Sequence, residues 1–212
     1  MASSSTLTQF GRVPVSTDVL KSVLSNYKAP QAHIRLMEKR GEIIQLRRDL
    51  YLCNNEGAYS RMLIANHLLR PSYVSYESAL SSYGIIPEAV YTIRSSCLSR
   101  SKYFENASGR YEYVQIPNNY YPHGITIGRT EQGYGYLIAR PEKAICDLIL
   151  ASSGLRLQSS KAAGEYLEYY LRADMEEVTR WDADLLHTIA LSAHKKRNDL
   201  LNLEKFIRHE CS

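Results

Sequence analysis

The stretch from Ser16 to Cys53 constrains the fold more than any other part of this 212-residue chain. Apolar residues recur at helical spacing after Ser16 and Thr17, residue types that can cap the free N–H groups at a helix start. After a short link, Pro30 marks the start of a second helix, because proline loses no hydrogen bond at the first helical position. Gly41 is placed to end it. The order predicts two helices joined by a tight turn.

The apolar spacing indicates which helix faces are buried. In the first helix the predicted buried face consists of Val19, Leu20, Val23, Leu24 and Tyr27. In the second helix the residues expected to face the core are Ala32, Leu36 and Met37. Its opposite face then carries a polar row, spaced by four residues, of Gln31, Arg35 and Lys39. That row is the surface a nucleic-acid groove would meet.

Two short segments rich in Ile, Leu and Tyr follow the second helix and predict a β-hairpin. They run from Glu42 to Arg47 and from Leu50 to Cys53, joined through Arg48 and Asp49. Two helices followed by an arginine-tipped hairpin are typical of a winged helix-turn-helix, which binds double-stranded DNA. The predicted DNA-binding residues are Lys28, Gln31, Arg35, Lys39, Arg47 and Arg48. The alternative is a solvated helix face and an ordinary polar turn.

The distribution of charge supports the DNA-binding hypothesis. Residues 1–53 contain eight Lys and Arg but four Asp and Glu, whereas residues 54–212 contain eighteen of each. All of the formal net charge of +4 therefore lies in the first quarter of the chain. This asymmetry favours a polyanion-binding N-terminal part attached to a neutral body.

Residues 54–58, Asn-Asn-Glu-Gly-Ala, are polar and turn-forming, and they mark the predicted domain boundary. We predict an α+β protein in two parts. Residues 1–55 form the winged helix-turn-helix, and residues 56–212 form an α+β domain. In that domain a small antiparallel or mixed sheet is expected at about residues 90–139, with C-terminal helices at about 141–210.

Several classes of protein are disfavoured. The four cysteines, Cys53, Cys97, Cys146 and Cys211, lie 44, 49 and 65 positions apart, so no CxxC pair or zinc spacing appears. No stretch approaches the roughly 20 apolar residues of a membrane span, and the first fifteen residues do not resemble a signal peptide. We predict a cytoplasmic protein with no cofactor and no membrane contact.

Tyrosine is concentrated in the middle of the chain, where thirteen of seventeen residues fall between Tyr51 and Tyr136. Tyr111 and Tyr113 alternate onto one strand face beside Arg110, which could form a stacking platform for single-stranded nucleic acid. In a domain with so little phenylalanine, tyrosine more often supplies core bulk while its hydroxyl finds a partner. We favour the core interpretation.

Glu142, Lys143 and Asp147 form the grouping that most resembles an active site. Two carboxylates and a lysine could hold Mg²⁺ beside a phosphate. At five positions apart on a helix, however, the two carboxylates point in different directions. His187 and His194 share a helix face but lack the HExxH pattern of a zinc site. We therefore predict no catalytic residue, no metal site and no enzyme, and keep a Mg²⁺-dependent nucleic-acid-processing enzyme as the alternative.

Three blocks of sequence resemble the AbiEi family of bacterial antitoxins. They are Leu46-Arg47-Arg48-Asp49-Leu50-Tyr51, then Tyr73-Val74-Ser75-Tyr76-Glu77-Ser78-Ala79-Leu80 with Tyr83-Gly84-Ile85-Ile86-Pro87, then Arg140-Pro141-Glu142-Lys143-Ala144-Ile145-Cys146-Asp147-Leu148. The blocks follow the family's order and spacing and span about residues 16–150. The middle block is the most specific of the three.

The resemblance implies a transcriptional regulator of a toxin–antitoxin system. In the family, an N-terminal winged helix-turn-helix binds operator DNA and represses its own operon, and a C-terminal domain counteracts a nucleotidyltransferase-like toxin encoded next door. The toxin is opposed without a tight stable complex, and the system is associated with phage defence. By position, the DNA role falls on Gln31, Arg35, Lys39, Arg47 and Arg48.

Two further expectations concern the wing and the assembly. The family commonly has glycine where this chain has Asp49, a residue type that adopts the left-handed conformation more readily than most. A winged helix that binds an inverted repeat often works in pairs, so a homodimer on DNA is expected. A winged helix that contacts protein instead of DNA is a further alternative.

Overall fold

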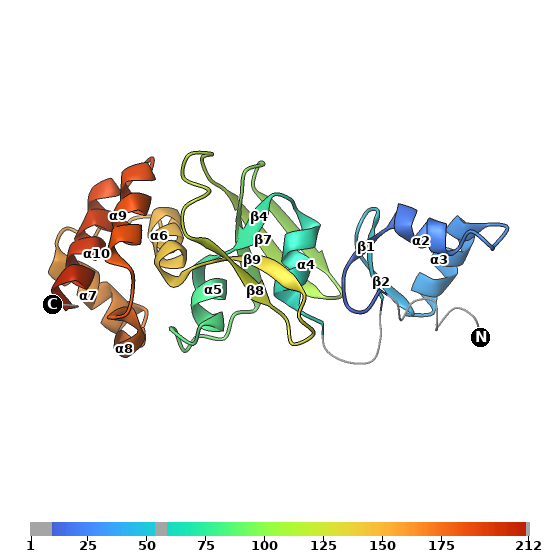
Figure 1. The fold of residues 1–212 in the computed structure, drawn as a ribbon, viewed down its shortest axis with the longest axis horizontal. Coiled ribbons are helices and arrows are strands. Elements are labelled where there is room, and N and C mark those ends of the chain that lie inside the picture. Colours follow the sequence, from blue (N-terminus) through green and yellow to red (C-terminus); the bar gives the residue numbers. More distant parts are fainter. Residues whose placement is uncertain (1–9, 54–58, 211–212) are drawn as a thin grey trace.

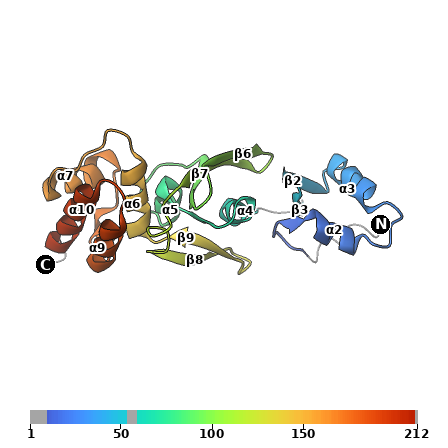
Figure 2. The ribbon, with the colours of Figure 1, turned by 90° about the horizontal axis from the view of Figure 1, so that it is seen from above.

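The computed structural model describes residues 10–53 and 59–210, so the predicted boundary at residues 54–58 lies outside the described residues. Figure 1 shows three parts in a row: N-terminal helices and a hairpin, a central sheet, and a group of C-terminal helices. The same order appears in the view from above (Figure 2), so the molecule is elongated. The architecture is mixed α+β, as the sequence predicts.

The N-terminal unit, residues 10–53, begins with two helices whose ends follow the sequence signals. Helix α2 (Thr17–Val23) is capped by Ser16, whose hydroxyl accepts a hydrogen bond from the Val19 N–H at 3.3 Å. Helix α3 (Pro30–Lys39) begins with proline and is followed by Gly41 at φ +71°. The predicted start of both helices and the predicted end of α3 are therefore confirmed, whereas α2 ends at Val23, before Leu24 and Tyr27 of its predicted face.

The predicted inner faces of these helices are partly wrong. Leu20, Leu24 and Met37 are buried as expected. Val19 is 43% and Leu36 is 40% exposed, and Ala32 is exposed too. On α3 the buried pair is Ile34 and Met37, because that stripe meets the hairpin and α2 in one small core.

The hairpin consists of β2 (Ile43–Arg47) and β3 (Leu50–Cys53), which turn at Arg48 and Asp49 as predicted. Asp49 adopts the left-handed conformation, at φ +64°. A short strand that the sequence did not predict, β1 (Val15–Ser16), pairs antiparallel with β3. It gives a sheet of order β1-β3-β2 beside the helices.

The body contains a mixed sheet of order β6-β7-β5-β4-β9-β8. Its strands are β4 (Ser72–Val74), β5 (Thr92–Cys97), β6 (Lys102–Asn106), β7 (Gly109–Gln115), β8 (Ile125–Arg129) and β9 (Gly135–Ala139). The β5–β7 and β4–β9 pairs are parallel, and the other pairs are antiparallel. The predicted start of the sheet near residue 90 is wrong, because β4 lies in its middle. Its three consecutive buried residues are too few to show a period of two.

Helices cover both faces of this sheet. On one face α4 (Arg61–Leu68) contacts β7, where the Tyr113 hydroxyl donates to the Ala65 carbonyl at 2.6 Å. On the other face lie α5 (Tyr76–Ser82) and α6 (Pro141–Ala151). Tyr111 and Tyr113 are 0% and 1% exposed, so they are core residues. The stacking-platform interpretation is therefore wrong, and the core interpretation is confirmed.

The C-terminal helices pack together beside α6. They are α7 (Ser160–Glu165), a π-helical turn η1 (Tyr166–Tyr170), α8 (Met175–Val178), α9 (Ala183–Ser192) and α10 (Arg197–Glu210). Tyr170, at the end of the π-helical turn, is 79% exposed, whereas Ala163 and Leu167 are buried. Across residues 10–53 and 59–210, no helix combines the length and the apolar character that crossing a membrane requires.

Candidate nucleic-acid interface

The outer face of α3 carries the predicted polar row without cover. Gln31, Arg35 and Lys39 are all exposed. On the opposite side of the same helix, Ile34 and Met37 are 0% and 1% exposed and pack against the hairpin core. Burial of this inner stripe fixes the rotation of α3 about its axis. The row therefore points to solvent because the helix is anchored from behind.

The link before α3 is held by a ring contact. The Tyr27 and His33 rings stack with their centroids 4.0 Å apart and an interplanar angle of 23°. Lys28, between them in sequence, is exposed. Its ammonium group therefore lies on a turn of defined shape next to the start of α3, where a phosphate oxygen could be bound.

The hairpin tip presents the two predicted arginines. The Arg48 side chain is 96% exposed, and its Nε lies 3.6 Å from a carboxylate oxygen of Asp49. The Arg47 guanidinium is exposed and donates to the Arg48 carbonyl at 3.1 Å. The Thr17 N–H donates to the Asp49 carbonyl at 3.2 Å, which ties the tip to the first residue of α2. Because the Arg48–Asp49 pair is exposed, it is weak and a phosphate can compete with it.

The outer face of the hairpin packs on the body, a contact that the sequence did not predict. Leu46, Leu50 and Leu52 are 3%, 6% and 1% exposed and belong to the large core of the body. The Asn106 side-chain amide donates to the Leu46 carbonyl at 2.8 Å. All four residues of β3 are buried, and the unbroken apolar run Leu-Tyr-Leu-Cys is the signal that could have revealed two covered faces.

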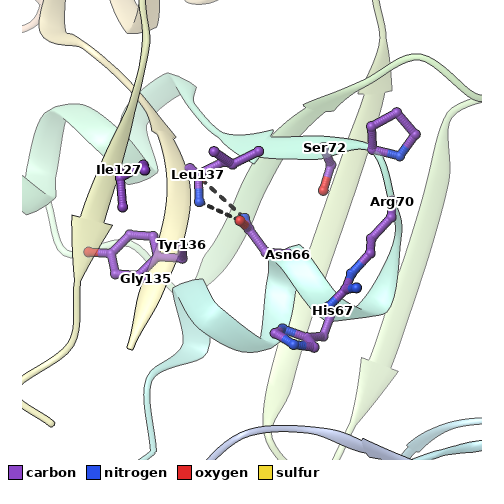
Figure 3. A pocket seen from close by; sticks show the side chains of 9 residues that line it. Asn66, His67, Arg70, Ser72, Ile127, Gly135, Tyr136 and Leu137 are labelled. Carbon is purple, nitrogen blue, oxygen red and sulfur yellow. Dashed lines mark hydrogen bonds between the residues drawn. The ribbon is translucent and has the colours of Figure 1, made fainter. Parts of the chain in front are cut away.

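A hollow of about 430 Å³ lies between α4 and the β8–β9 hairpin (Figure 3). The Asn66 amide donates to the Leu137 carbonyl at 3.1 Å and accepts a hydrogen bond from the Leu137 N–H. It thereby replaces a strand partner for this part of β9. Ile127 and Leu137 leave the hollow largely apolar, at 63% and 38% exposed. Asn66 therefore completes the sheet, and its hydrogen-bonding groups are engaged by the backbone.

Asp147 is the centre of a buried polar network. One carboxylate oxygen accepts hydrogen bonds from the hydroxyls of Tyr73, Ser75 and Ser96, at 3.0, 2.6 and 3.0 Å. The other accepts from Tyr120 at 2.8 Å and lies 3.5 Å from the Lys143 ammonium. Burial lowers the pKa of Lys143, and the charge of Asp147 opposes that change. The network holds β4, β5 and α6 together.

Glu142 belongs to a separate network. One of its oxygens accepts from the Asp182 N–H at 2.9 Å and from the Arg140 guanidinium at 3.2 Å. The carboxylates of Glu142 and Asp147 therefore point apart, as their spacing predicts, and do not form a joint Mg²⁺ site. His187 lies 3.9 Å from Glu204 instead of joining His194. Among the residues that the structure describes, no three His, Cys, Asp or Glu side chains are grouped to hold a metal ion.

Comparisons with known proteins define the fold but not the role. No protein-family model matches the chain, and no curated protein is similar to it. The crystal structure of the RV2827C protein from Mycobacterium tuberculosis is similar, with a TM-score of 0.62 and 12% sequence identity. The likeness covers 98% of this chain and 78% of that one. At this identity it establishes only a shared mixed α+β arrangement.

Proposed function

We propose that this protein binds double-stranded DNA through its N-terminal unit, with α3 as the reader helix and the β2–β3 hairpin as a wing. The order of α2, link, α3 and hairpin, with β1 as a third strand, supports the proposal of a winged helix-turn-helix. One observation carries the proposal: two different elements of the unit, α3 and the hairpin tip, both present uncovered cations.

The position of each side chain supports a division of roles. Recognition helices contact base edges mainly with residues toward their N-terminus. We therefore assign the base contacts to Gln31, in the first turn of α3, and to Arg35, one turn further along the same face. Amide and guanidinium groups read adenine and guanine edges respectively. Lys39, in the last turn of α3, and the tip residues Arg47 and Arg48 suit phosphates, which position the protein without reading sequence.

Two variants test the proposal by gel shift on the DNA upstream of the gene and on a mixed-sequence duplex. Arg35→Ala should weaken binding to the upstream DNA by about 1–3 kcal/mol, and it should reduce the preference for that DNA over the mixed-sequence duplex. Arg47→Ala/Arg48→Ala should weaken binding to both duplexes equally. It should also make the slope of log affinity against log salt concentration shallower by about 1.8.

Lys161→Ala is the matched control, because Lys161 is an exposed cation on α7, in the C-terminal helix group. It should leave both affinities unchanged. All of these side chains are exposed, so thermal unfolding should show equal stability. Unchanged gel shifts in both N-terminal variants would refute the assignment of α3 and the hairpin.

For the biological role we propose an antitoxin that autorepresses its operon and counteracts a nucleotidyltransferase-like toxin. The support is the likeness of three sequence blocks to the AbiEi family, together with a body joined to a basic N-terminal unit. Repression at an inverted repeat would use two copies of the chain. Neutralisation would proceed without a tight complex, as the resemblance implies.

The antitoxin role predicts a separation of functions. Co-expression of the protein should restore growth of cells that express the product of the adjacent gene. The combined Arg35→Ala/Arg47→Ala/Arg48→Ala variant should still restore growth, because it alters only the N-terminal unit, while it no longer represses a reporter driven by the upstream DNA. Failure of the unmodified protein to restore growth would contradict the antitoxin role and leave DNA binding to its own test.

A further inference from the structure

A groove of about 610 Å³ separates the hairpin from the body. Its wall on the N-terminal unit includes Arg47 and Leu50, and its wall on the body includes Arg70, Lys102 and Phe104. Lys102 and Phe104 are two residues apart on β6 and therefore lie on the same face of the strand, which is the face toward the groove. The described lining residues include several cations and no acidic side chain. The groove is therefore cationic although the body as a whole is neutral.

The two walls are held in a fixed relation. Leu46 is buried in the core of the body, and its carbonyl accepts the Asn106 amide at 2.8 Å. Leu50 is buried in the same core and also lines the groove. Arg47 therefore cannot move away from Arg70 and Lys102 without breaking apolar packing. The three cations are preorganised as one surface built from two parts of the chain.

The cations of the body wall lack intramolecular counter-charges. Arg70 and Lys102 are exposed, and neither forms an ion pair with any residue in the described part of the chain. Elsewhere on the body, arginines are commonly paired, as Arg94 is with Glu77 at 2.8 Å and Arg110 with Glu105 at 3.1 Å. Cations left unpaired in a concave surface attract an anionic ligand from solution.

Figure 3 shows His67, at the end of α4, beside Arg70. His67 also lines the groove. Burial lowers the pKa of His67, and the charge of Arg70 lowers it further. Its Nδ1 lies 3.0 Å from the Leu63 carbonyl. Near neutral pH the positive charge of the groove therefore comes from the two arginines and the lysine.

We propose that this groove binds the phosphate backbone of duplex DNA, so that Arg70 and Lys102 extend the DNA contact from the wing onto the body. The inference rests on the proposed DNA binding by α3 and the hairpin. It is favoured over an acidic peptide because Arg47 belongs both to the groove and to the hairpin tip. A DNA strand that passes Arg48 at the tip is already beside the groove. The body would then make a second set of phosphate contacts with the same DNA strand.

The test uses Arg70→Gln/Lys102→Gln in the full chain, with a labelled mixed-sequence duplex of about 30 base pairs, roughly three helical turns. Fluorescence anisotropy is measured over a series of KCl concentrations. Each lost phosphate contact makes the slope of log affinity against log salt concentration shallower by about 0.9. The slope measured for the double variant should therefore be shallower by about 1.8. Arg70→Lys/Lys102→Arg keeps both charges and should keep the original slope.

Lys161→Gln/Lys205→Gln removes two exposed cations from the C-terminal helices and should leave the slope unchanged. Arg47→Ala/Arg48→Ala is measured in parallel. If only the wing variant is shallower, the groove inference is overturned and the proposed function stands. If only the groove variant is shallower, the groove binds DNA and the wing assignment is overturned. If neither variant changes the slope, the groove inference and the wing assignment are both overturned.

Discussion

Replacing Asp147 by alanine is expected to lower the free energy of unfolding by about 3–5 kcal/mol, the usual cost of removing one partner from a buried ion pair. Asp147 is 2% and Lys143 is 0% exposed. The substitution would leave the Lys143 ammonium buried without its counter-ion. It would also leave hydroxyls from β4, from β5 and from Tyr120 in the β7–β8 loop without their shared acceptor. Urea unfolding followed by circular dichroism measures the loss.

The matched control is Glu168→Ala, which removes an exposed carboxylate from the π-helical turn and should change stability by less than about 0.5 kcal/mol. Lys143→Met should cost less than Asp147→Ala, because four hydroxyl groups still donate to Asp147. A loss below about 1 kcal/mol for Asp147→Ala would show that the network is not a determinant of the fold.

Stability should also fall steeply above about pH 10, by at least roughly 5 kcal/mol per pH unit from four of the buried tyrosines. Burial raises the pKa of Tyr73, Tyr76, Tyr113 and Tyr120 above the ordinary value of 10.0, and the charge of Asp147 adds to this for all but Tyr113. A raised pKa in the folded state means that the contribution to stability is complete below the unfolded-state pKa and is lost as pH rises. Each of the four then contributes about 1.36 kcal/mol per unit.

Urea unfolding at about pH 9, 10 and 11 measures this slope, and phenolate absorbance should appear together with the loss of structure. Tyr113→Phe should reduce the slope by about 1.36 kcal/mol per pH unit, because one buried phenol with a raised pKa is removed. Tyr169→Phe is the control, since Tyr169 is 68% exposed. Gradual ionisation of all four buried tyrosines in the folded protein would contradict the prediction.

The local parts of the fold were predictable because short-range signals decide them. Ser16, Pro30 and Gly41 mark helix ends through caps and backbone conformation, and the structure places each where the sequence predicts. The second strand of the hairpin, Leu50–Cys53, was predicted with its observed bounds. The inner face of α3 was less predictable, since Leu36 and Ile34 are both apolar and only the position of the hairpin selects between them.

The candidate interface divides in the same way. Exposure of the six predicted DNA-binding residues follows from polar side chains on a helix anchored from behind and on a hairpin tip. Arg70 and Lys102 carry no such local signal. They lie 32 positions apart and approach Arg47 only because the outer face of the hairpin packs on the body. The groove is formed by residues that are distant in sequence, so short-range sequence patterns do not predict it.

By itself, the sequence determined the mixed α+β class, the concentration of charge in the first quarter, and a helix and hairpin that expose cations. These depend on periodicity, caps and turns within a few residues. Only the tertiary structure decided that β4 lies in the middle of its sheet, that Asp147 is buried among hydroxyls, and that the hairpin docks on the body. Each of these depends on contacts between distant residues, and burial there is decided by what the rest of the chain brings alongside.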